Sequence, residues 1–106
     1  MTETIQRLMD EMKKGLVRLY GTRLRGVYLY GSYARDEADR ESDVDLMVVL
    51  DRVPNYTAEI ERTGMLVSSM SLQYGVSVSR VFVSEQDWAG HQTPFLANVR
   101  DEAVQA

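Results

Sequence analysis

Two aspartates that stand one residue apart, Asp43 and Asp45, are followed at once by an apolar run over residues 46–50. In a β-strand, residues i and i+2 point to the same face, so both carboxylates would project together while Val44 enters the core. Two like charges placed side by side destabilise a strand unless a cation lies between them. Magnesium suits such a pair, because it takes hard oxygen ligands, few of them from protein, and completes its shell with water and substrate phosphates. A solvated acidic pair at the mouth of a strand is the alternative interpretation.

A glycine–serine pair, Gly31-Ser32, follows a strand-like segment and could bind an anion. Glycine lets the backbone approach a ligand closely, and the free N–H groups at the start of a helix attract phosphate. Ser32 is a good N-cap for a short helix over residues 33–35. Arg35 would then lie on the same side as Ser32 and could reach a phosphate oxygen. A simple turn, with Arg35 paired to the acidic residues that follow it, is the alternative.

The spacing between the two features is more specific than either one. Ten residues separate Ser32 from Asp43, which gives Gly-Ser-x10-Asp-x-Asp before an apolar strand. The segment GSYARDEADRESDVDLMVVL resembles the active-site motif of the polymerase β-like nucleotidyltransferase superfamily, especially its minimal, MNT-type branch. A looser similarity extends through the third strand to FLANVRDE. The resemblance implies a small α/β (α+β) fold with one mixed sheet and helices packed against it.

The resemblance also implies a role for each residue of the motif. Asp43, Asp45 and Ser32 would be catalytic, with Asp43 and Asp45 as ligands of the cofactor Mg²⁺. Gly31, Ser32 and Arg35 would bind the triphosphate of the substrate ATP. The reaction would transfer AMP to a hydroxyl of a partner protein, and minimal members typically act as the antitoxin of a HEPN ribonuclease toxin. A catalytically degenerate module that neutralises its partner sterically is the alternative function.

The sequence departs from the superfamily's pattern at two points. Active members usually carry a third carboxylate on a neighbouring strand, but the polar residues of the expected strand are Ser77, Ser79 and Arg80. Without that acid, the proton of the acceptor hydroxyl would have to go to solvent, to the substrate or to a partner residue. Asp36 replaces a glycine of the pattern, and aspartate enters left-handed turns more readily than most residues.

The pattern of apolar residues predicts the elements that position the motif. Strands are expected over residues 26–30, 44–50 and 76–83, where β-branched and aromatic residues gather. Apolar residues at three- and four-residue spacing predict a first helix that ends at Gly21. Its buried stripe would be Ile5, Leu8, Met9, Met12, Leu16, Leu19 and Tyr20.

Three further helices are expected after the second strand. Thr57 would cap a long helix whose inner face is Ile60, Met65, Leu66, Val67, Met70 and Tyr74. A capping-box pattern begins at Ser84 and opens a short helix that carries Trp88. Thr93 and Pro94 would open the last helix, with Phe95, Leu96 and Val99 facing inward.

Length, composition and charge set limits on the class of protein. A chain of 106 residues is expected to be one nucleotidyltransferase domain, 1–106, so a large acceptor must be held by a partner or by a second copy in a homo-oligomer. The absence of cysteine excludes disulfides and fits a reducing compartment. A net charge of −4 argues against direct binding of nucleic acid. With no signal-peptide pattern or membrane-length apolar run, we expect a cytoplasmic protein that does not bind membranes. The single histidine, His91, is expected on the surface.

Overall fold

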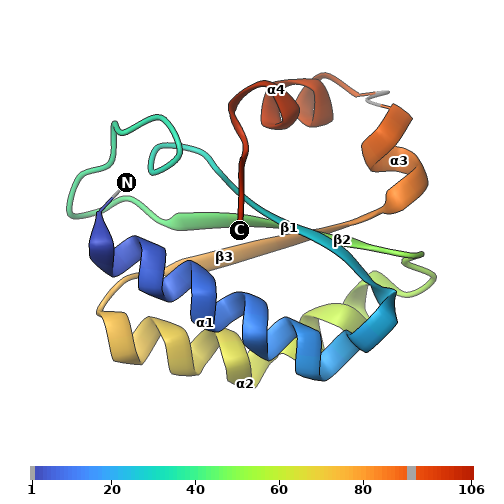
Figure 1. Cartoon of the computed structure of the whole chain (residues 1–106), viewed down its shortest axis with the longest axis horizontal. Helices are drawn as coiled ribbons and strands as arrows, with labels where there is room; N and C mark the ends of the chain where they lie inside the picture. The colour runs from blue at the N-terminus through green and yellow to red at the C-terminus, as the bar shows by residue number, and fades with distance from the viewer. Residues whose placement is uncertain (1, 91–92) are drawn as a thin grey trace.

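The computed structural model describes residues 2–90 and 93–106, so His91 lies outside the described residues. The chain forms both helices and strands (Figure 1). In order they are α1 (Glu3–Tyr20), the 3-10 turn η1 (Gly21–Arg23), β1 (Leu24–Tyr30), β2 (Val44–Leu50), α2 (Tyr56–Tyr74), β3 (Val78–Ser84), α3 (Glu85–Gly90), α4 (Pro94–Glu102) and β4 (Val104–Gln105).

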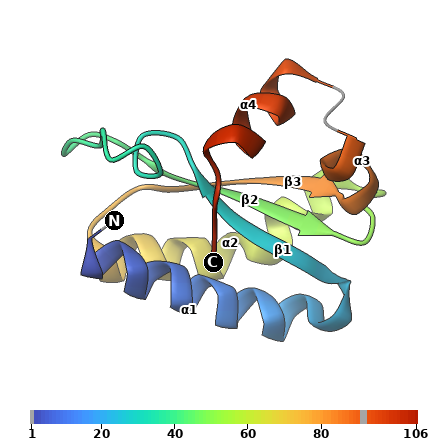
Figure 2. The same ribbon diagram turned by 45° about the horizontal axis from the view of Figure 1, so that its top comes forward.

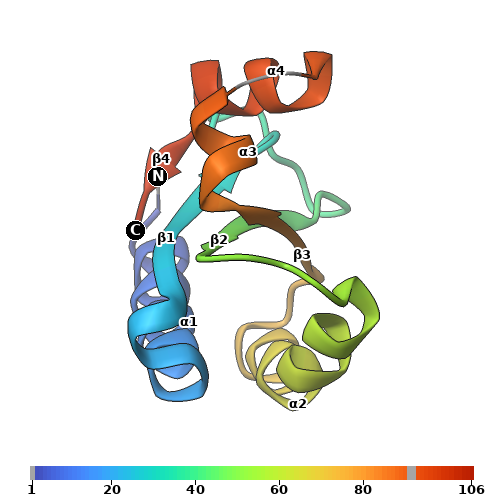
Figure 3. The same cartoon turned by 90° about the vertical axis from the view of Figure 1, so that its right-hand side faces the viewer.

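The strands form one mixed sheet in the order β3-β2-β1-β4. β1 runs antiparallel to both β2 and β4, whereas β2 and β3 are parallel. The parallel pair needs a long crossover connection, and α2 supplies it. Helices α1 and α2 cover one face of the sheet, and α3 and α4 lie over the other face (Figure 3). The predicted α/β fold with a mixed sheet and packed helices is confirmed.

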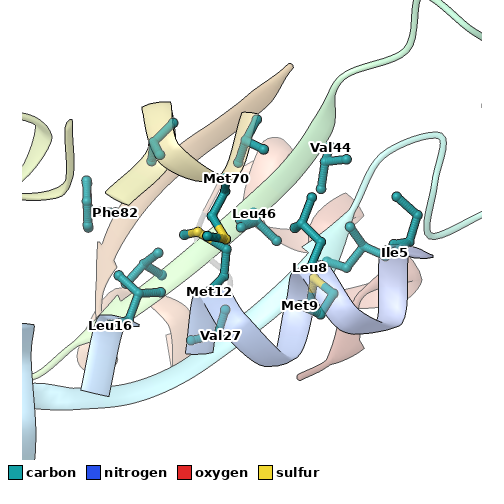
Figure 4. Packing of buried hydrophobic residues seen from close by; sticks show 14 of the residues in the cluster. Ile5, Leu8, Met9, Met12, Leu16, Val27, Val44, Leu46, Met70 and Phe82 are labelled. Carbon is teal, nitrogen blue, oxygen red and sulfur yellow. The ribbon is translucent and has the colours of Figure 1, made fainter. Parts of the chain in front are cut away.

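The larger part of the core lies between the sheet and the α1–α2 layer. Side chains from α1 point toward Val27, Val44 and Leu46 of the sheet, with Met70 and Phe82 beside them (Figure 4). Burying this apolar surface supplies most of the driving force for folding. All of the predicted stripe on α1 is buried except Leu19, which is 41% exposed.

A second, smaller core lies between the sheet and the α3–α4 layer. Its buried members are Met47, Val49, Val83, Trp88, Leu96 and Val99. The Tyr28 ring from β1 packs at 4.7 Å from the Trp88 ring. Because β2 contributes to both cores, both of its faces are covered, which explains its nearly continuous apolar sequence.

The prediction of a short helix after Ser32 is wrong, because residues 32–36 form a series of turns. The C=O of Gly31 accepts hydrogen bonds from the N–H groups of Ala34 and Arg35, at 3.1 and 3.2 Å. Asp36 then adopts a left-handed conformation with φ 57°, as expected for the residue in this position, and the chain turns away before a helix can continue.

Three local expectations in the later helices are also wrong. The cap of α2 is Asn55, whose Oδ1 accepts from the N–H of Ala58, so the helix starts before Thr57. Met65 is 88% exposed, because it lies on the outer side of α2, away from α1 and the sheet. Phe95 is 47% exposed and packs edge-on against Tyr30, while its neighbours Leu96 and Val99 are buried as predicted.

The bounds of β1 and β3 differ from the expected ones, since β1 begins at Leu24, two residues before the predicted start, and β3 ends at Ser84, one residue after the predicted end. β3 begins at Val78, two residues after the predicted start, and β4 was not predicted. β4 contains only Val104 and Gln105, which pair with Leu29 and Tyr28 of β1. Within the described residues, none of the helices has the length and apolar character needed to cross a membrane.

Candidate functional site

The site is built where β1 ends and where β2 and β3 begin. The strand register places Tyr30, Asp45 and Ser79 in one row across these three strands. Residues paired across neighbouring strands point to the same face. That face is the one covered by α3 and α4, since Met47 and Val49, which alternate with Asp45, belong to the α3–α4 core. The segment between β1 and β2 projects from this end of the sheet (Figure 2).

Asp43 and Asp45 flank a fully buried valine at the start of β2. Val44 enters the main core, whereas Asp43 is exposed and Asp45 is half-buried. Burial and the neighbouring charge of Asp43 raise the pKa of Asp45, and the positive charge of Arg35 opposes this rise. The two carboxylates are therefore close enough to repel each other. A cation bound beside them would relieve that repulsion.

Gly31 lies against Asp45 and needs to be glycine. Its φ is +79°, a left-handed conformation that costs an L-residue energy. A Cβ added at Gly31 would collide with the Asp45 carboxylate. The fold thus joins the two halves of the sequence motif into one site, with the backbone of the turn packed directly on the acidic strand.

Ser32 and Arg35 lie on the turn that follows Gly31. Ser32 is half-buried, and its hydroxyl makes no hydrogen bond to the residues that the structure describes. The Arg35 Nε donates to Glu37 Oε2 at 3.0 Å, which is the pairing with the acidic segment expected as an alternative. The other branch of the guanidinium, Nη1, donates to Glu102 Oε2 at 2.7 Å.

Glu102 is a residue of the site that sequence reasoning missed. Its Oε2 accepts a hydrogen bond from the N–H of Gly31 at 2.8 Å, besides the bond from Arg35. Its negative charge also contributes to the raised pKa of Asp45, after burial and the charge of Asp43. The only signal in the sequence was its place in the FLANVRDE segment. An acidic residue at the end of a helix is usually solvated, so this signal did not indicate a role in the site.

The strand pairing decides which residue occupies the place of the expected third acid. Ser79 is paired with Asp45 and lies on the same face, whereas Ser77 comes before β3 begins. Arg80 lies on the opposite face and ties β3 to α2, since it donates to the C=O of Ile60 at 2.7 Å and to Thr63 Oγ1 at 3.0 Å. The position that faces Asp45 thus carries a hydroxyl.

A metal cage made only of protein ligands is absent from the described ranges 2–90 and 93–106, where no three carboxylate, histidine or cysteine side chains are grouped to hold an ion. The carboxylate pair at Asp43 and Asp45 instead fits an ion that brings other ligands with it. Magnesium bound to phosphates has this character, because it uses one or two protein carboxylates and keeps several non-protein oxygens.

Comparisons with known proteins agree with this geometry. A family model described as "Nucleotidyltransferase domain" matches residues 9–91. The chain is 29% identical over 98 residues to Methanocaldococcus jannaschii MJ0141, provisionally named a protein adenylyltransferase, and the match covers 92% of this chain and 94% of that protein. It is 35% identical over 71 residues to the protein adenylyltransferase MntA of Thermococcus cleftensis, covering 67% of this chain and 70% of that protein.

Solved structures share the fold. One that is described provisionally as a minimal nucleotidyltransferase matches with a TM-score of 0.65 and 25% identity, covering 96% of this chain and 92% of that chain. A crystal structure of a toxin–antitoxin with AMP-PNP matches with a TM-score of 0.64 and 23% identity, over 89% of this chain and 68% of that chain. With a family model that spans most of its length and a sheet that brings the Gly31-Ser32 turn onto the aspartate pair, this chain belongs to the nucleotidyltransferase domain family.

Proposed function

We propose that this chain transfers a nucleoside monophosphate, AMP from Mg-ATP, to a hydroxyl of a partner protein. The observation that carries the proposal is the contact between the Gly31 turn and Asp45, which puts a backbone donor and a carboxylate pair on one spot. The relatives named as protein adenylyltransferases support both the donor and the class of acceptor.

The acidic pair fits Mg²⁺ as the cofactor. Asp43 and Asp45 supply two hard oxygen ligands, and the raised pKa of Asp45, caused by burial and by the charge of Asp43, marks a place where added positive charge is favourable. When bound, the ion would neutralise charge on the phosphates and on the oxygens that enter and leave at the reacting phosphorus.

The chain's own residues would hold and orient the nucleotide. The N–H of Gly31 and the Ser32 hydroxyl would donate to phosphate oxygens, and Arg35 would add a charge-assisted hydrogen bond. The acceptor oxygen then forms a bond to the α-phosphorus, while the bond from that phosphorus to the bridging oxygen breaks and pyrophosphate leaves. Because a serine faces Asp45 at position 79, the acceptor's proton would pass to solvent or to a group of the partner.

We propose a toxin as the partner, of the HEPN ribonuclease type, and the cytoplasm as the place where they meet. The chain would act as the antitoxin by modifying a hydroxyl of that toxin. A relative named MntA and a toxin–antitoxin structure of the same fold that contains AMP-PNP support this setting.

Labelling of the partner tests the proposal. The chain is co-expressed with the toxin and incubated with Mg²⁺ and ATP that is labelled at the α-phosphate. We expect label on the toxin, and loss of that label when Asp43→Asn and Asp45→Asn are combined. The matched control combines Glu41→Gln with Asp101→Asn, which removes the same charge from two exposed residues. Equal labelling by the site variant and the control would contradict the assigned site.

A second function, steric neutralisation by a degenerate nucleotidyltransferase, is favoured by one observation. The residue facing Asp45 on the neighbouring strand is Ser79 and not an acid. Under this alternative, the Asp43→Asn, Asp45→Asn variant would still neutralise the toxin fully. Under adenylyl transfer it would fail, so a toxicity assay with the double variant separates the two functions.

A further inference from the structure

Two hydrogen-bond donors of the candidate nucleotide site already converge on one carboxylate oxygen. The N–H of Gly31 donates to Glu102 Oε2 at 2.8 Å, and Arg35 Nη1 donates to the same oxygen at 2.7 Å. A backbone N–H and a guanidinium that meet on one anionic oxygen are the donors that proteins use for phosphate. The contacting oxygen of Glu102 therefore stands where an oxygen of a phosphate group would be bound.

Glu102 is held in this place by the structure on both sides of it. It is the last residue of α4, and the N–H of the next residue, Ala103, donates to the C=O of Val99 at 2.8 Å. Immediately afterwards, Val104 pairs with Leu29 in the sheet. With only 22% of its side chain exposed, Glu102 is held at the site by these neighbours in the nucleotide-free chain and differs from a solvated surface acid.

The oxygen of Glu102 that contacts Gly31 and Arg35 is not available to a metal ion. This oxygen, Oε2, is engaged by two donors, one of them a cation, and a lone pair that accepts such bonds is not free for an ion. In the part of the chain that the structure describes, Glu102 does not form a three-ligand group with Asp43 and Asp45. Glu102 nevertheless adds a negative charge beside Asp45. The phosphates of a nucleotide would have to bind next to this charge.

We infer that Glu102 occupies a phosphate-binding position in the nucleotide-free chain, so that an incoming nucleoside triphosphate must displace its carboxylate from Gly31 and Arg35. This inference rests on the proposed function and deepens it, because it names the internal competitor of the nucleotide. When the triphosphate binds, Gly31 and Arg35 lose their hydrogen bonds to Glu102 and form hydrogen bonds to a phosphate oxygen instead. The affinity for nucleotide is therefore lower than it would be if Glu102 did not occupy this position.

The inference predicts that removal of the Glu102 carboxylate tightens nucleotide binding. Glu102→Gln keeps the length of the side chain but removes its charge, which weakens both bonds and also the repulsion of the phosphates. The expected Kd for Mg-AMP-PNP, a nucleotide analogue that resists cleavage, falls about tenfold relative to the unchanged protein. Glu102→Ala, which leaves no oxygen at this position, is expected to lower the Kd at least as much.

Calorimetric titration of the full chain with Mg-AMP-PNP measures this effect without turnover. The matched control is Asp101→Asn, which removes the same charge from the adjacent, exposed residue of α4 and is expected to change the Kd less than about twofold. A Kd that is unchanged or higher in Glu102→Gln would overturn the inference, while binding by the unchanged protein would leave the proposed function standing. Absence of binding by all of the variants and the unchanged protein would overturn both.

A measurement on the unchanged protein keeps the test valid if the variants fold poorly. With ¹³C-labelled glutamate and ¹⁵N-labelled backbone, the Glu102 carboxyl resonance and the Gly31 amide resonance are followed as Mg-AMP-PNP is added. Displacement predicts that both resonances shift together with one saturation curve. A Glu102 carboxyl resonance that stays in place while the nucleotide saturates the protein would contradict the inference.

Discussion

Asp45 and Ser79 face each other on neighbouring parallel strands, on the side of the sheet that carries the Gly31 turn. Asp45 is half-buried and its pKa is raised by burial and by Asp43, so its charge is poorly compensated in the free protein. Ser79 offers a hydroxyl at the point where a third carboxylate would complete the acidic cluster. This pair therefore separates two questions, whether the site binds a magnesium nucleotide and how fast it turns the nucleotide over.

Ser79→Asp is expected to speed the transfer reaction by about 10²-fold, because general-base assistance contributes about 10²–10⁴-fold. The initial rate at which label passes from ATP to the partner measures this effect. Ser77→Asp is the matched control, since Ser77 is exposed and precedes β3, and it should leave the rate unchanged. If Ser79→Asp slows transfer while nucleotide still binds, position 79 is not the place of a missing base.

Gly31→Ala is expected to destabilise the fold by about 2–4 kcal/mol, the sum of a left-handed conformation and a steric clash with Asp45. Gly64→Ala provides the opposite case, because Gly64 lies inside α2 and an added Cβ meets nothing within 4 Å. That substitution should stabilise the protein by about 0.5–1 kcal/mol. Urea unfolding of both variants measures the difference, and equal stabilities for the two would refute the tight fit at Gly31.

The sequence predicted the parts of the fold that rest on strong local patterns. β2 was predicted at its observed bounds because a long apolar run next to two aspartates has few other interpretations. The left-handed conformation of Asp36 could also be predicted, because aspartate enters left-handed turns more readily than most residues. β4 was missed because two residues, Val104 and Gln105, show no periodicity, and their pairing with β1 depends on contacts distant in sequence.

The candidate site was predictable only in part for a similar reason. Gly31, Ser32, Asp43 and Asp45 lie in one continuous motif, so their types and spacing placed them together. Glu102 reaches the same spot from the end of α4, and a single acid at a helix end has no local signal that distinguishes it from a solvated residue. Only the packing of α4 on the sheet shows that its carboxylate points at Gly31.

Asp45→Asn is expected to raise the melting temperature in metal-free buffer at pH 7. Burial and the charge of Asp43 raise the folded-state pKa of Asp45 above its ordinary value of 3.8, so its charged form costs stability at neutral pH. The protonated form of Asp45 is the one that the folded protein favours. Its contribution to stability is fully present below the unfolded-state pKa and is lost as the pH rises through the folded-state pKa. The gain from Asp45→Asn should therefore shrink as the pH is lowered below that range. Thermal melts from pH 3 to pH 8 measure it, and a lower melting temperature at pH 7 would contradict this electrostatic account.

Glu59→Gln is expected to lower the free energy of unfolding by about 2–3 kcal/mol, because it weakens hydrogen bonds to a buried charge. Glu59 Oε1 accepts from the Tyr20 hydroxyl at 2.8 Å and from Arg62 Nε at 3.0 Å, and Arg23 lies 3.5 Å from its other oxygen. This network lies outside the candidate site, so nucleotide affinity should not change. Glu61→Gln, on the exposed side of the same helix, is the control and should leave stability within about 0.5 kcal/mol.

The stabilising effect of Glu59 should depend on pH in the opposite sense to that of Asp45. Burial acts to raise the pKa of Glu59, but the hydrogen bonds from Tyr20 and Arg62 and the charges of Arg62 and Arg23 outweigh it and hold the pKa below the ordinary value of 4.5. The contribution is present above the unfolded-state pKa and is lost as the pH falls through the folded-state pKa. The difference between the unchanged protein and Glu59→Gln should thus be constant from pH 6 to pH 8 and should shrink below about pH 4.5. A difference that grows toward acid would contradict the network.

The binding of a metal nucleotide at the meeting point of the Gly31 turn and Asp45 is tested most directly by paramagnetic broadening. AMP-PNP loaded with Mn²⁺ in place of Mg²⁺ is added to the ¹⁵N-labelled protein, and the loss of each amide signal is measured. We predict the strongest losses at Gly31, at Ser32 and over residues 43–45, and little broadening when Asp43→Asn and Asp45→Asn are combined. Broadening centred on another part of the molecule, or unchanged by the double variant, would contradict the assigned site.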